Sequence, residues 1–298
     1  MTLDTWRETG EFSQHRGHRI FYRDAGSGEA VVCIHGFPTA SWDWHRVWPR
    51  LCEEFRLIAP DMLGFGFSDK PAGYRYSIHD QADLIEGLLD GLGIRRVRIL
   101  AHDYGDTVAQ ELLARFEERQ RSADPGIDVT SICFLNGGLF PESHRLRPIQ
   151  RLLRSRLGPL VGRLTSEKRF RKAFSEIFGP RTRPSIEDLR AFWRLIETNG
   201  GRRIAHRLIR YIDERTRFRE RWVGALQAST IPLRLIDGPE DPVAGRHMAD
   251  RYRELVPNAD VVLLDGIGHY PQLEDSPGVL RAVLAFWNGK TADSPPCC

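Results

Sequence analysis

One aspartate of the chain stands where a side chain could act as a nucleophile. An apolar run ends at Ala101, a helix begins within a few residues, and Asp103 lies between Ala101 and Gly105, which are both small. This pattern predicts a nucleophile elbow, a sharp turn that lifts its central side chain above a sheet and needs small neighbours because backbones approach closely. A carboxylate there can attack carbon and form an ester intermediate. A lone aspartate could also simply cap the helix, so the interpretation depends on its partners.

Two residues late in the chain provide such partners. His269 lies in a glycine-flanked loop after a predicted strand, where it could activate water as a general base. Asp241 follows another predicted strand and lies past Gly238, from where it could turn towards the histidine and stabilise its charged form. Asp237 and Glu240 are the alternatives for this acid. The order along the chain is therefore nucleophile, acid and base.

A third element could stabilise negative charge on oxygen. The sequence His35-Gly-Phe-Pro38 directly follows a buried strand. A glycine-containing loop at that place can present a backbone N–H to a developing oxyanion. We expect the N–H groups of Phe37 and of Tyr104, the residue after the nucleophile, to form this pair.

The elements that must position these residues alternate between strand and helix. Two short strands are expected within residues 10–24, further strands over 29–34, 56–59, 97–101, 132–135, 233–237 and 261–264, and helices over 78–92, 107–116, 246–255 and 277–287. Apolar runs bounded by turn residues indicate the strands, and apolar residues at helical spacing indicate the helices. This alternation predicts an α/β fold with a mostly parallel, doubly wound sheet.

Residues 141–225 break the alternation, because they read as helices without intervening strands. We therefore predict a helical cap over 141–225, inserted into a body formed by 1–140 and 226–298. The cap has 22 Lys/Arg against 9 Asp/Glu, a net charge of +13, whereas the rest of the 298 residues has 21 against 31, or −10. The positive charge of the cap can simply belong to a solvated helical surface. The alternative is that it attracts anionic substrates, lipid headgroups or an acidic partner. No nucleic-acid motif with stacking aromatics accompanies the basic residues.

Composition narrows the class of protein. With 41% hydrophobic and 28% charged residues the chain is ordinary globular protein. Its five cysteines are scattered without metal-ligand spacing: Cys33, Cys52, Cys133, Cys297 and Cys298. Cys33 and Cys133 fall in predicted buried strands, so we expect them in the core. No apolar run approaches the roughly 18 residues of a spanning helix, and the first residues are too polar for a signal peptide. We expect a cytoplasmic monomer or homodimer that uses no metal or cofactor.

Taken together, these motifs resemble the aspartate-nucleophile branch of the α/β-hydrolase superfamily, the epoxide hydrolases and haloalkane dehalogenases. The motifs that carry this resemblance are HGFP (35–38), DMLGFGFSDKP (61–71), AHDYG (101–105), GPEDP (238–242) and GHYPQLED (268–275). A closer resemblance, which includes the cap, is to the mesoderm-specific transcript group, through residues 102–113, 135–145, 178–185, 220–226 and 269–275. Animal members of that group have a hydrophobic N-terminal segment that this chain lacks, so we expect no membrane attachment of that kind.

The resemblance implies attack by Asp103 on a saturated carbon of a small, apolar to amphipathic substrate. Epoxide hydrolases stabilise the resulting alkoxide with cap tyrosines, usually two, and Tyr211 is the only tyrosine of residues 141–225. Phe174 or Phe178 occupies the region of the second and could not donate. Dehalogenases hold halide with N–H donors, for which Trp193 and Trp222 of the cap are candidates.

Two further residues complete the expected site. Asn136 follows a strand near the cap entrance and is predicted as a hinge or substrate contact. Asp106 stands where relatives commonly have glycine. We expect it to cap the following helix or interact with its dipole, and a carboxylate so close to Asp103 could also raise the pKa of Asp103.

The sequence therefore favours an epoxide hydrolase that converts an epoxide and water to a diol. A haloalkane or haloacid dehalogenase with the same triad is the first alternative. A non-catalytic protein that binds a ligand or lipid is the second, suggested by the basic cap and Asp106.

Overall fold

The computed structural model describes residues 1–289, so Cys297, Cys298 and the end of the predicted segment 226–298 lie outside the described residues. The strands are β1 (Glu11–His15), β2 (His18–Ala25), β3 (Ala30–Ile34), β4 (Arg56–Pro60), β5 (Arg96–His102), β6 (Asp128–Leu135), β7 (Leu233–Asp237) and β8 (Asp260–Leu263). They form one sheet in the order β1-β2-β4-β3-β5-β6-β7-β8. β2 pairs antiparallel with β1 and with β4, and every other neighbouring pair is parallel.

The parallel strands determine where the predicted site residues meet. Parallel strands have their carboxyl ends at the same edge of a sheet, and the loops that follow them collect there. The loops after β3, β5, β6 and β7 contain Phe37, Asp103, Asn136 and Asp241 in turn. Residues far apart in the sequence are therefore brought to one edge by topology alone.

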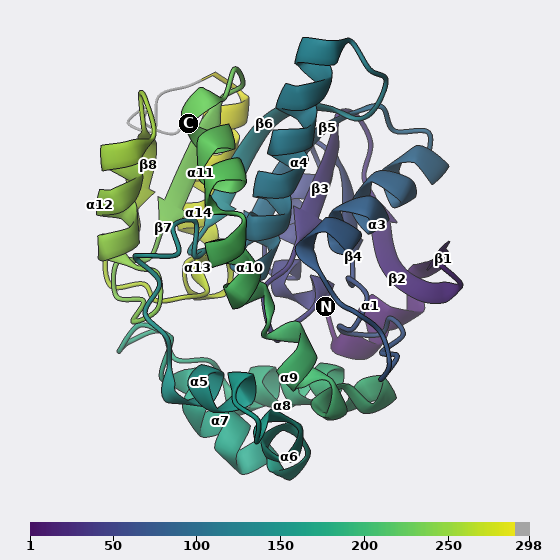
Figure 1. The fold of residues 1–298 in the computed structure, drawn as a ribbon, viewed down its shortest axis with the longest axis vertical. Helices are drawn as coiled ribbons and strands as arrows, with labels where there is room; N and C mark the ends of the chain where they lie inside the picture. Colours follow the sequence, from purple (N-terminus) through teal and green to yellow (C-terminus); the bar gives the residue numbers. More distant parts are fainter. Residues whose placement is uncertain (290–298) are drawn as a thin grey trace.

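Helices cover both faces of the sheet (Figure 1). The helices of the body are α1 (Leu3–Glu8), η1 (Ser41–Trp44), α2 (Trp48–Cys52), α3 (Ile78–Gly91), α4 (Tyr104–Ser122), α12 (Arg246–Leu255), α13 (Pro271–Glu274) and α14 (Ser276–Trp287). Alternate residues of β3 enter two separate cores: Val32 and Ile34 pack with α3, α4 and α12, whereas Val31 and Cys33 pack with α1, α2 and α14. The expected burial of Cys33 and Cys133 is confirmed. No helix of residues 1–289 combines the length and the hydropathy that spanning a bilayer requires.

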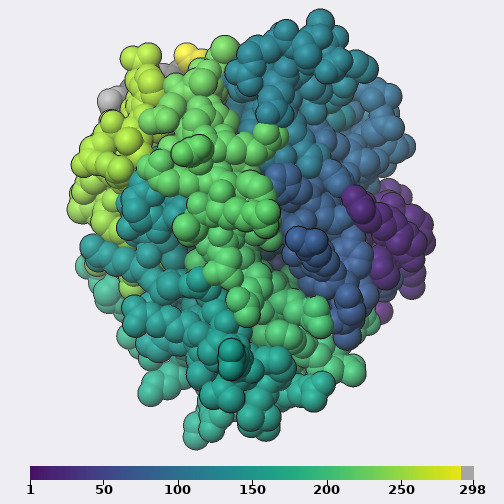
Figure 2. All heavy atoms as spheres, viewed as in Figure 1, coloured from purple at the N-terminus to yellow at the C-terminus, as the bar shows by residue number. Residues whose placement is uncertain are grey.

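Helices alone connect β6 to β7. They are α5 (Pro148–Arg154), α6 (Gly158–Leu164), α7 (Glu167–Ser175), α8 (Ile186–Glu197), η2 (Thr198–Arg203), α9 (Ala205–Leu208), α10 (Tyr211–Arg217) and α11 (Arg219–Ala228). Figure 1 shows α5 to α9 gathered beyond one end of the sheet. α11 packs on α4 of the body, and Figure 2 shows the teal and green atoms of the insertion in continuous contact with the body on this face. The division at residues 141 and 225 stays a prediction.

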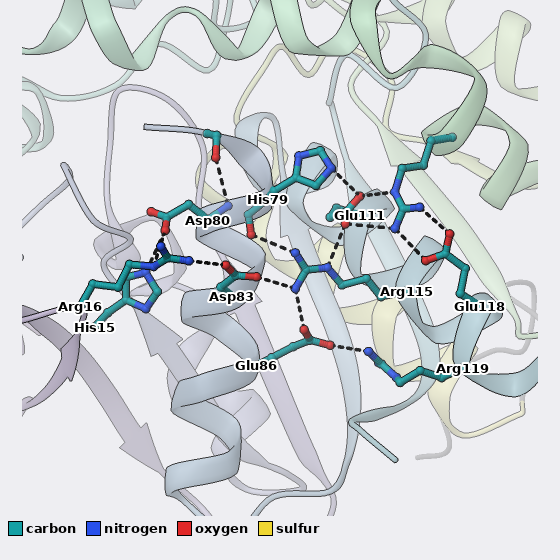
Figure 3. A network of polar contacts seen from close by, with 12 residues as sticks. His15, Arg16, His79, Asp80, Asp83, Glu86, Glu111, Arg115, Glu118 and Arg119 are labelled. Carbon is teal, nitrogen blue, oxygen red and sulfur yellow. Dashed lines mark hydrogen bonds and ion pairs between the residues drawn. The ribbon is translucent and has the colours of Figure 1, made fainter. Parts of the chain in front are cut away.

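A buried glutamate ties α3, α4 and α11 together (Figure 3). Glu111 of α4 is 1% exposed and accepts hydrogen bonds from Arg115 Nε (2.8 Å), Arg221 Nε (2.7 Å) and Trp222 Nε1 (2.8 Å). Arg115 also reaches Glu86 of α3 at 2.7 Å. Burial raises the pKa of Glu111, but its hydrogen bonds outweigh this and hold the pKa below its usual value. The insertion is thus fastened to the body by a charged network.

Replacement of Glu111 tests the contribution of this network to stability. Glu111→Ala removes an acceptor shared by the partly exposed Arg115 and Arg221, which keep other carboxylate partners, and leaves the buried indole N–H of Trp222 without its acceptor, so it should lower the free energy of unfolding by about 2 kcal/mol. Glu118→Ala removes an ion pair with Arg221 at a carboxylate that is half exposed, and should cost less than about 1 kcal/mol. Urea denaturation of both variants measures the difference. Equal losses would contradict the assignment.

Candidate active site

The elbow around Asp103 has the strained backbone that its predicted geometry requires. Asp103 lies between β5 and α4 with φ 47° and ψ −101°, outside the regions that residues other than glycine normally adopt. A Cβ added at Gly105 would lie 2.2 Å from the carbonyl oxygen of Ile34, so only glycine fits there. The turn holds the Asp103 carboxylate at the end of the sheet, where it is 4% exposed.

One backbone N–H already contacts this carboxylate. The N–H of Phe37 donates to Asp103 Oδ2 at 3.1 Å. Tyr104 is the first residue of α4, so its N–H has no partner within the helix. Of the two predicted oxyanion residues, Phe37 therefore contacts the carboxylate directly, and Asp103 Oδ1 is the oxygen without a contact to Phe37.

The structure brings His269 and Asp241 to the same place. His269 Nδ1 lies 2.6 Å from Asp241 Oδ2, and its Nε2 lies 4.0 Å from Asp103 Oδ2. All three side chains are buried. Of the two alternatives for the acid, Asp237 instead accepts a hydrogen bond from the amide of Asn136, and Glu240 is exposed. Asp241 is thus the carboxylate that orients the histidine.

Charge balance sets the protonation states of this group. Burial alone would raise the pKa of Asp103, but the charges of His269 and Arg215 outweigh it and hold the pKa below its usual value. For His269 burial alone would lower the pKa, but Asp241 and then Asp103 outweigh it and raise the pKa to about 9. At neutral pH the site therefore holds an ionised Asp103 beside a protonated His269.

Arg215 of α10 is the main feature of the site that sequence reasoning missed. It is 2% exposed, its Nη2 donates to the Asp103 carbonyl oxygen at 2.8 Å, and the same nitrogen lies 3.5 Å from Asp103 Oδ1. Its Nε donates to Thr107 at 2.7 Å. The guanidinium thereby fixes the strained turn and places positive charge next to the nucleophile. One arginine among the 22 basic residues of 141–225 has no distinguishing sequence signal.

Tyr211 lies against the same turn, one helical turn before Arg215. Its ring is 4.8 Å from that of Tyr104 and 6.0 Å from that of Phe37. Its buried hydroxyl has no partner with good hydrogen-bond geometry, but it lies close enough to Asp103 and Arg215 for both to affect its pKa. Burial and the Asp103 charge raise the pKa of Tyr211, so the hydroxyl stays protonated as a donor.

The other predicted cap residues lie in different surroundings. Phe178 stacks on Tyr270, the neighbour of His269, with ring centroids 5.2 Å apart. Trp193 packs against Phe170, with ring centroids 5.6 Å apart, and under the guanidinium of Arg202. Phe178 thus borders the histidine loop, whereas Trp193 packs within the insertion.

Asn136 holds the acid loop. Its Nδ2 donates to Asp237 Oδ1 at 3.1 Å and to Asp241 Oδ2 at 3.2 Å, and its Oδ1 accepts from the N–H of Gly238 at 2.7 Å. The residue is fully buried with φ 38°, a left-handed conformation that asparagine tolerates. These contacts occupy the amide with the loop that carries Asp241, and the expected role of Asn136 as a hinge or substrate contact stays a prediction.

Glu274 fastens the histidine loop to the insertion. One carboxylate oxygen accepts from the N–H groups of Gly179 (2.8 Å) and Gly268 (2.9 Å) and from the hydroxyl of Thr182, and the other accepts from the N–H of Tyr270 (2.9 Å). Gly179 and Thr182 belong to the insertion. Glu274 falls inside the motif of residues 268–275, so its position was marked in the sequence although its role was not.

A small apolar cavity of about 20 Å³ lies between body and insertion and borders the site through Phe37. Phe37 and Phe65 line it from the body, and Leu195 and Leu208 line it from α8 and α9. Lys70 closes one side, where its ammonium donates to three backbone carbonyls, among them Leu195 O at 2.7 Å. Within residues 1–289 no cluster of three or more His, Cys, Asp or Glu side chains could hold a metal ion.

Asp106 does not cap α4 as expected. It is fully buried in the first turn, and neither carboxylate oxygen has a partner with good hydrogen-bond geometry, although contact with the backbone of Leu135 lowers its pKa slightly against the effect of burial. Burial, and then the charge of Asp103, raise its pKa well above the usual value. The negative charge that could have raised the pKa of Asp103 is therefore absent, because Asp106 is the neutral carboxyl group and Asp103 the charged one.

This protonation state predicts a pH-dependent stability. A buried carboxyl group with a raised pKa stabilises the fold at low pH, and that contribution is lost as pH rises above the unfolded pKa of about 4. Asp106→Asn cannot ionise, so its free energy of unfolding relative to the native protein should increase by at least about 1 kcal/mol between pH 4 and pH 7. Urea unfolding at both pH values measures this, with the exposed Asp124→Asn as control. A difference that does not change with pH would contradict the assignment.

Comparison with known proteins agrees with this geometry. A model of the alpha/beta hydrolase family matches residues 31–283. The chain is 46% identical over 297 residues to the mesoderm-specific transcript homolog protein of Bos taurus, which covers 96% of this chain and 88% of that protein. It is 40% identical over 282 residues to the putative hydrolase LipZ of Mycobacterium tuberculosis, which covers 94% and 96%.

Solved structures confirm the fold class. The epoxide hydrolase CorEH superposes with a TM-score of 0.76 at 22% identity over 94% of this chain and 99% of its own. The haloalkane dehalogenase DatA from Agrobacterium tumefaciens C58 superposes with a TM-score of 0.79 at 23% identity over 94% and 96%. The family match and these superpositions lead to one conclusion: the chain belongs to the alpha/beta hydrolase family.

Proposed function

We propose that this protein is a hydrolase that forms a covalent ester on Asp103, and that its substrate is an epoxide. One observation carries the proposal: an ionised, buried carboxylate on a strained elbow has the N–H of Phe37 on Oδ2, while Oδ1, the oxygen for attack, lies 3.5 Å from Arg215 Nη2. A serine or cysteine at this position would need a base for activation, whereas an ionised aspartate does not. This agrees with the 4.0 Å between His269 Nε2 and Asp103 Oδ2, which is longer than a hydrogen bond.

In the first step Asp103 Oδ1 bonds to a ring carbon of the epoxide, and the carbon–oxygen bond of the ring breaks. The ring oxygen becomes an alkoxide that needs a proton. Tyr211 supports this assignment, because its buried hydroxyl has no partner with good hydrogen-bond geometry and lies beside the nucleophile. The apolar side chains beside Phe37 suit an apolar to amphipathic epoxide, and the cavity of about 20 Å³ that they line must widen to admit one, because it has room for about one water molecule.

In the second step water attacks the carbonyl carbon of the Asp103 ester, and His269 takes the proton of that water. Formation of the ester removes the negative charge of Asp103, one of the groups that raise the pKa of His269 to about 9. The pKa of His269 therefore falls once the ester has formed, so the imidazole gives up its proton to solvent, and Tyr211 regains from solvent the proton that it gave to the alkoxide. After water has attacked, the bond between the Asp103 carbonyl carbon and the diol oxygen breaks. That oxygen takes the remaining proton of the attacking water, so the diol leaves with Asp103 ionised and His269 protonated, as at the start.

Dehalogenation is the second candidate, since it begins with the same attack. It releases halide, which needs N–H donors near the reacting carbon. Trp222 does not offer one, because its indole N–H donates to Glu111 at 2.8 Å. The side chains of Phe37 and Tyr104 carry no N–H either. Arg215 has N–H groups beside Asp103, but its Nε donates to Thr107 and its Nη2 to the Asp103 carbonyl oxygen. Epoxide opening therefore has the stronger support.

Blocking the second step tests the covalent intermediate. His269→Gln should accumulate an ester on Asp103, because the base that activates water is absent. Intact-mass measurement after incubation with an epoxide should show an increase equal to the whole mass of the substrate. A haloalkane would instead add its mass less that of the hydrogen halide. Peptide mapping should place the adduct on residue 103.

The control is the double variant Asp103→Asn/His269→Gln, which should stay unmodified. If no epoxide, haloalkane or ester in a panel modifies His269→Gln or turns over with the native protein, the chain does not catalyse these reactions. That result would favour the non-catalytic binding alternative.

Tyr211→Phe distinguishes the two reactions at constant shape. Removal of the hydroxyl should slow alkylation of Asp103 by an epoxide by about 100-fold, because the alkoxide loses its proton donor. Alkylation by a haloalkane of similar size should change by less than about threefold, since halide needs no proton. Single-turnover kinetics monitored by mass measure both rates. Equal effects on the two substrates would show that Tyr211 acts only through packing.

A further inference from the structure

The outer helices of the insertion expose an unusual number of apolar side chains. Within residues 1–289 eight large hydrophobic residues are exposed, and five of them come from positions 149–164. The five are Ile149 (38%), Leu152 (42%), Leu157 (58%), Leu160 (54%) and Leu164 (61%). Scattered single residues of this kind are normal on a protein surface, whereas a cluster marks an interaction site.

The same segment is strongly basic. Residues 143–166 contain six arginines and no aspartate or glutamate. Arg147 and Arg154 form ion pairs with Glu176 and Asp213. Among the described residues, the other four, Arg145, Arg151, Arg156 and Arg163, have no ion-pair partner, and all four are exposed. We call the five apolar residues and the three arginines that lie among them in the sequence, Arg151, Arg156 and Arg163, the apolar–basic face.

We propose that the apolar–basic face docks onto an anionic lipid surface. Short helices that present apolar side chains between basic residues lie in the plane of a membrane interface, with their apolar groups at the boundary of the acyl chains. Arginine suits this arrangement because its long apolar stem can lie along the lipid while its charged head stays at the headgroups. Anionic headgroups supply the negative charge that the three unpaired arginines lack.

A second copy of this chain would fit the face less well. A symmetric dimer through the face would place the same patch on both subunits. It would bring the unpaired Arg151, Arg156 and Arg163 of each copy together in a segment that has no acidic residue to separate them. Like charges in such an interface oppose association.

The position of the face connects it with the apolar cavity. α5 and α6 lie at the end of the molecule away from the sheet (Figures 1 and 2). α6 packs closely on η2 and α9, since a Cβ added at Gly162 would lie 2.4 Å from the carbonyl oxygen of Arg202. Gly201 of η2 and Leu208 of α9 line the cavity. A docked molecule would therefore hold the cavity near the lipid, where apolar substrates concentrate.

Vesicle binding tests the proposal with the full chain. The protein should co-sediment with phosphatidylcholine vesicles that contain about 30% phosphatidylserine and much less with phosphatidylcholine alone. Leu157→Glu/Leu160→Glu/Leu164→Glu should lower the partition coefficient at least about tenfold. Arg151→Gln/Arg156→Gln should lower it by about fivefold per residue, and raised salt should reduce binding of the native protein.

Phe12→Glu is the matched control, because Phe12 is 43% exposed on β1 of the body and its replacement should leave binding unchanged. Thermal melting checks that each variant is folded. Failure of the native protein to bind anionic vesicles, or equal binding by the triple variant, would overturn the proposal. A concentration-dependent dimer that the triple variant abolishes, without vesicle binding, would assign the face to a second copy. None of these outcomes depends on an activity of Asp103.

Discussion

The site depends on keeping a buried carboxylate ionised, since Asp103 is only 4% exposed. Burial by itself favours the protonated form of Asp103, and a protonated carboxyl group is a poor nucleophile. Two cations reverse this balance: His269, held by Asp241, and Arg215, which contacts both the backbone and the side chain of residue 103. The neighbouring Asp106 has no partner with good hydrogen-bond geometry and takes the neutral form. Two buried carboxyl groups with different environments thus have opposite charge states, a common arrangement where one of them must react.

Both the body and the insertion contribute residues to the site around Asp103. The parallel strands bring the loops of Phe37, Asp103 and Asp241 to one edge of the sheet, and α10 of the insertion adds Tyr211 and Arg215 from the other side. Glu274 fixes the insertion to the histidine loop through backbone N–H groups. A change in the position of the insertion would therefore alter the charge around Asp103 as well as the shape of the cavity.

Much of this architecture is readable from the sequence because strand and loop patterns are local. The expected strand over 233–237 and helix over 246–255 have the observed bounds, and the buried runs before Phe37 and Asp103 form β3 and β5. The helix expected over 107–116 begins earlier, at Tyr104, because Asp103 is the last residue of the turn and the N-cap of α4. α1 was not expected, since its six residues bury only Leu3 and Trp6 and give no periodic pattern.

Contacts between distant segments are what the sequence does not reveal. Arg215 is one of many arginines, and only the fold places it 3.5 Å from Asp103. Asn136 was recognised as important from its place after a strand, but its bonds to Asp237 and Asp241 come from loops about 100 residues away. The charge state of Asp106 depends equally on burial that no local pattern shows.

The covalent ester on Asp103 is the central claim, and isotope transfer in a single turnover tests it most directly. With enzyme in excess over an epoxide in water labelled with ¹⁸O, the first diol should carry only unlabelled oxygen, because one of its hydroxyls derives from the Asp103 carboxylate. The label should then be found in the peptide that contains Asp103. A diol that carries ¹⁸O in the first turnover, with unlabelled Asp103, would show direct attack by water and contradict the account.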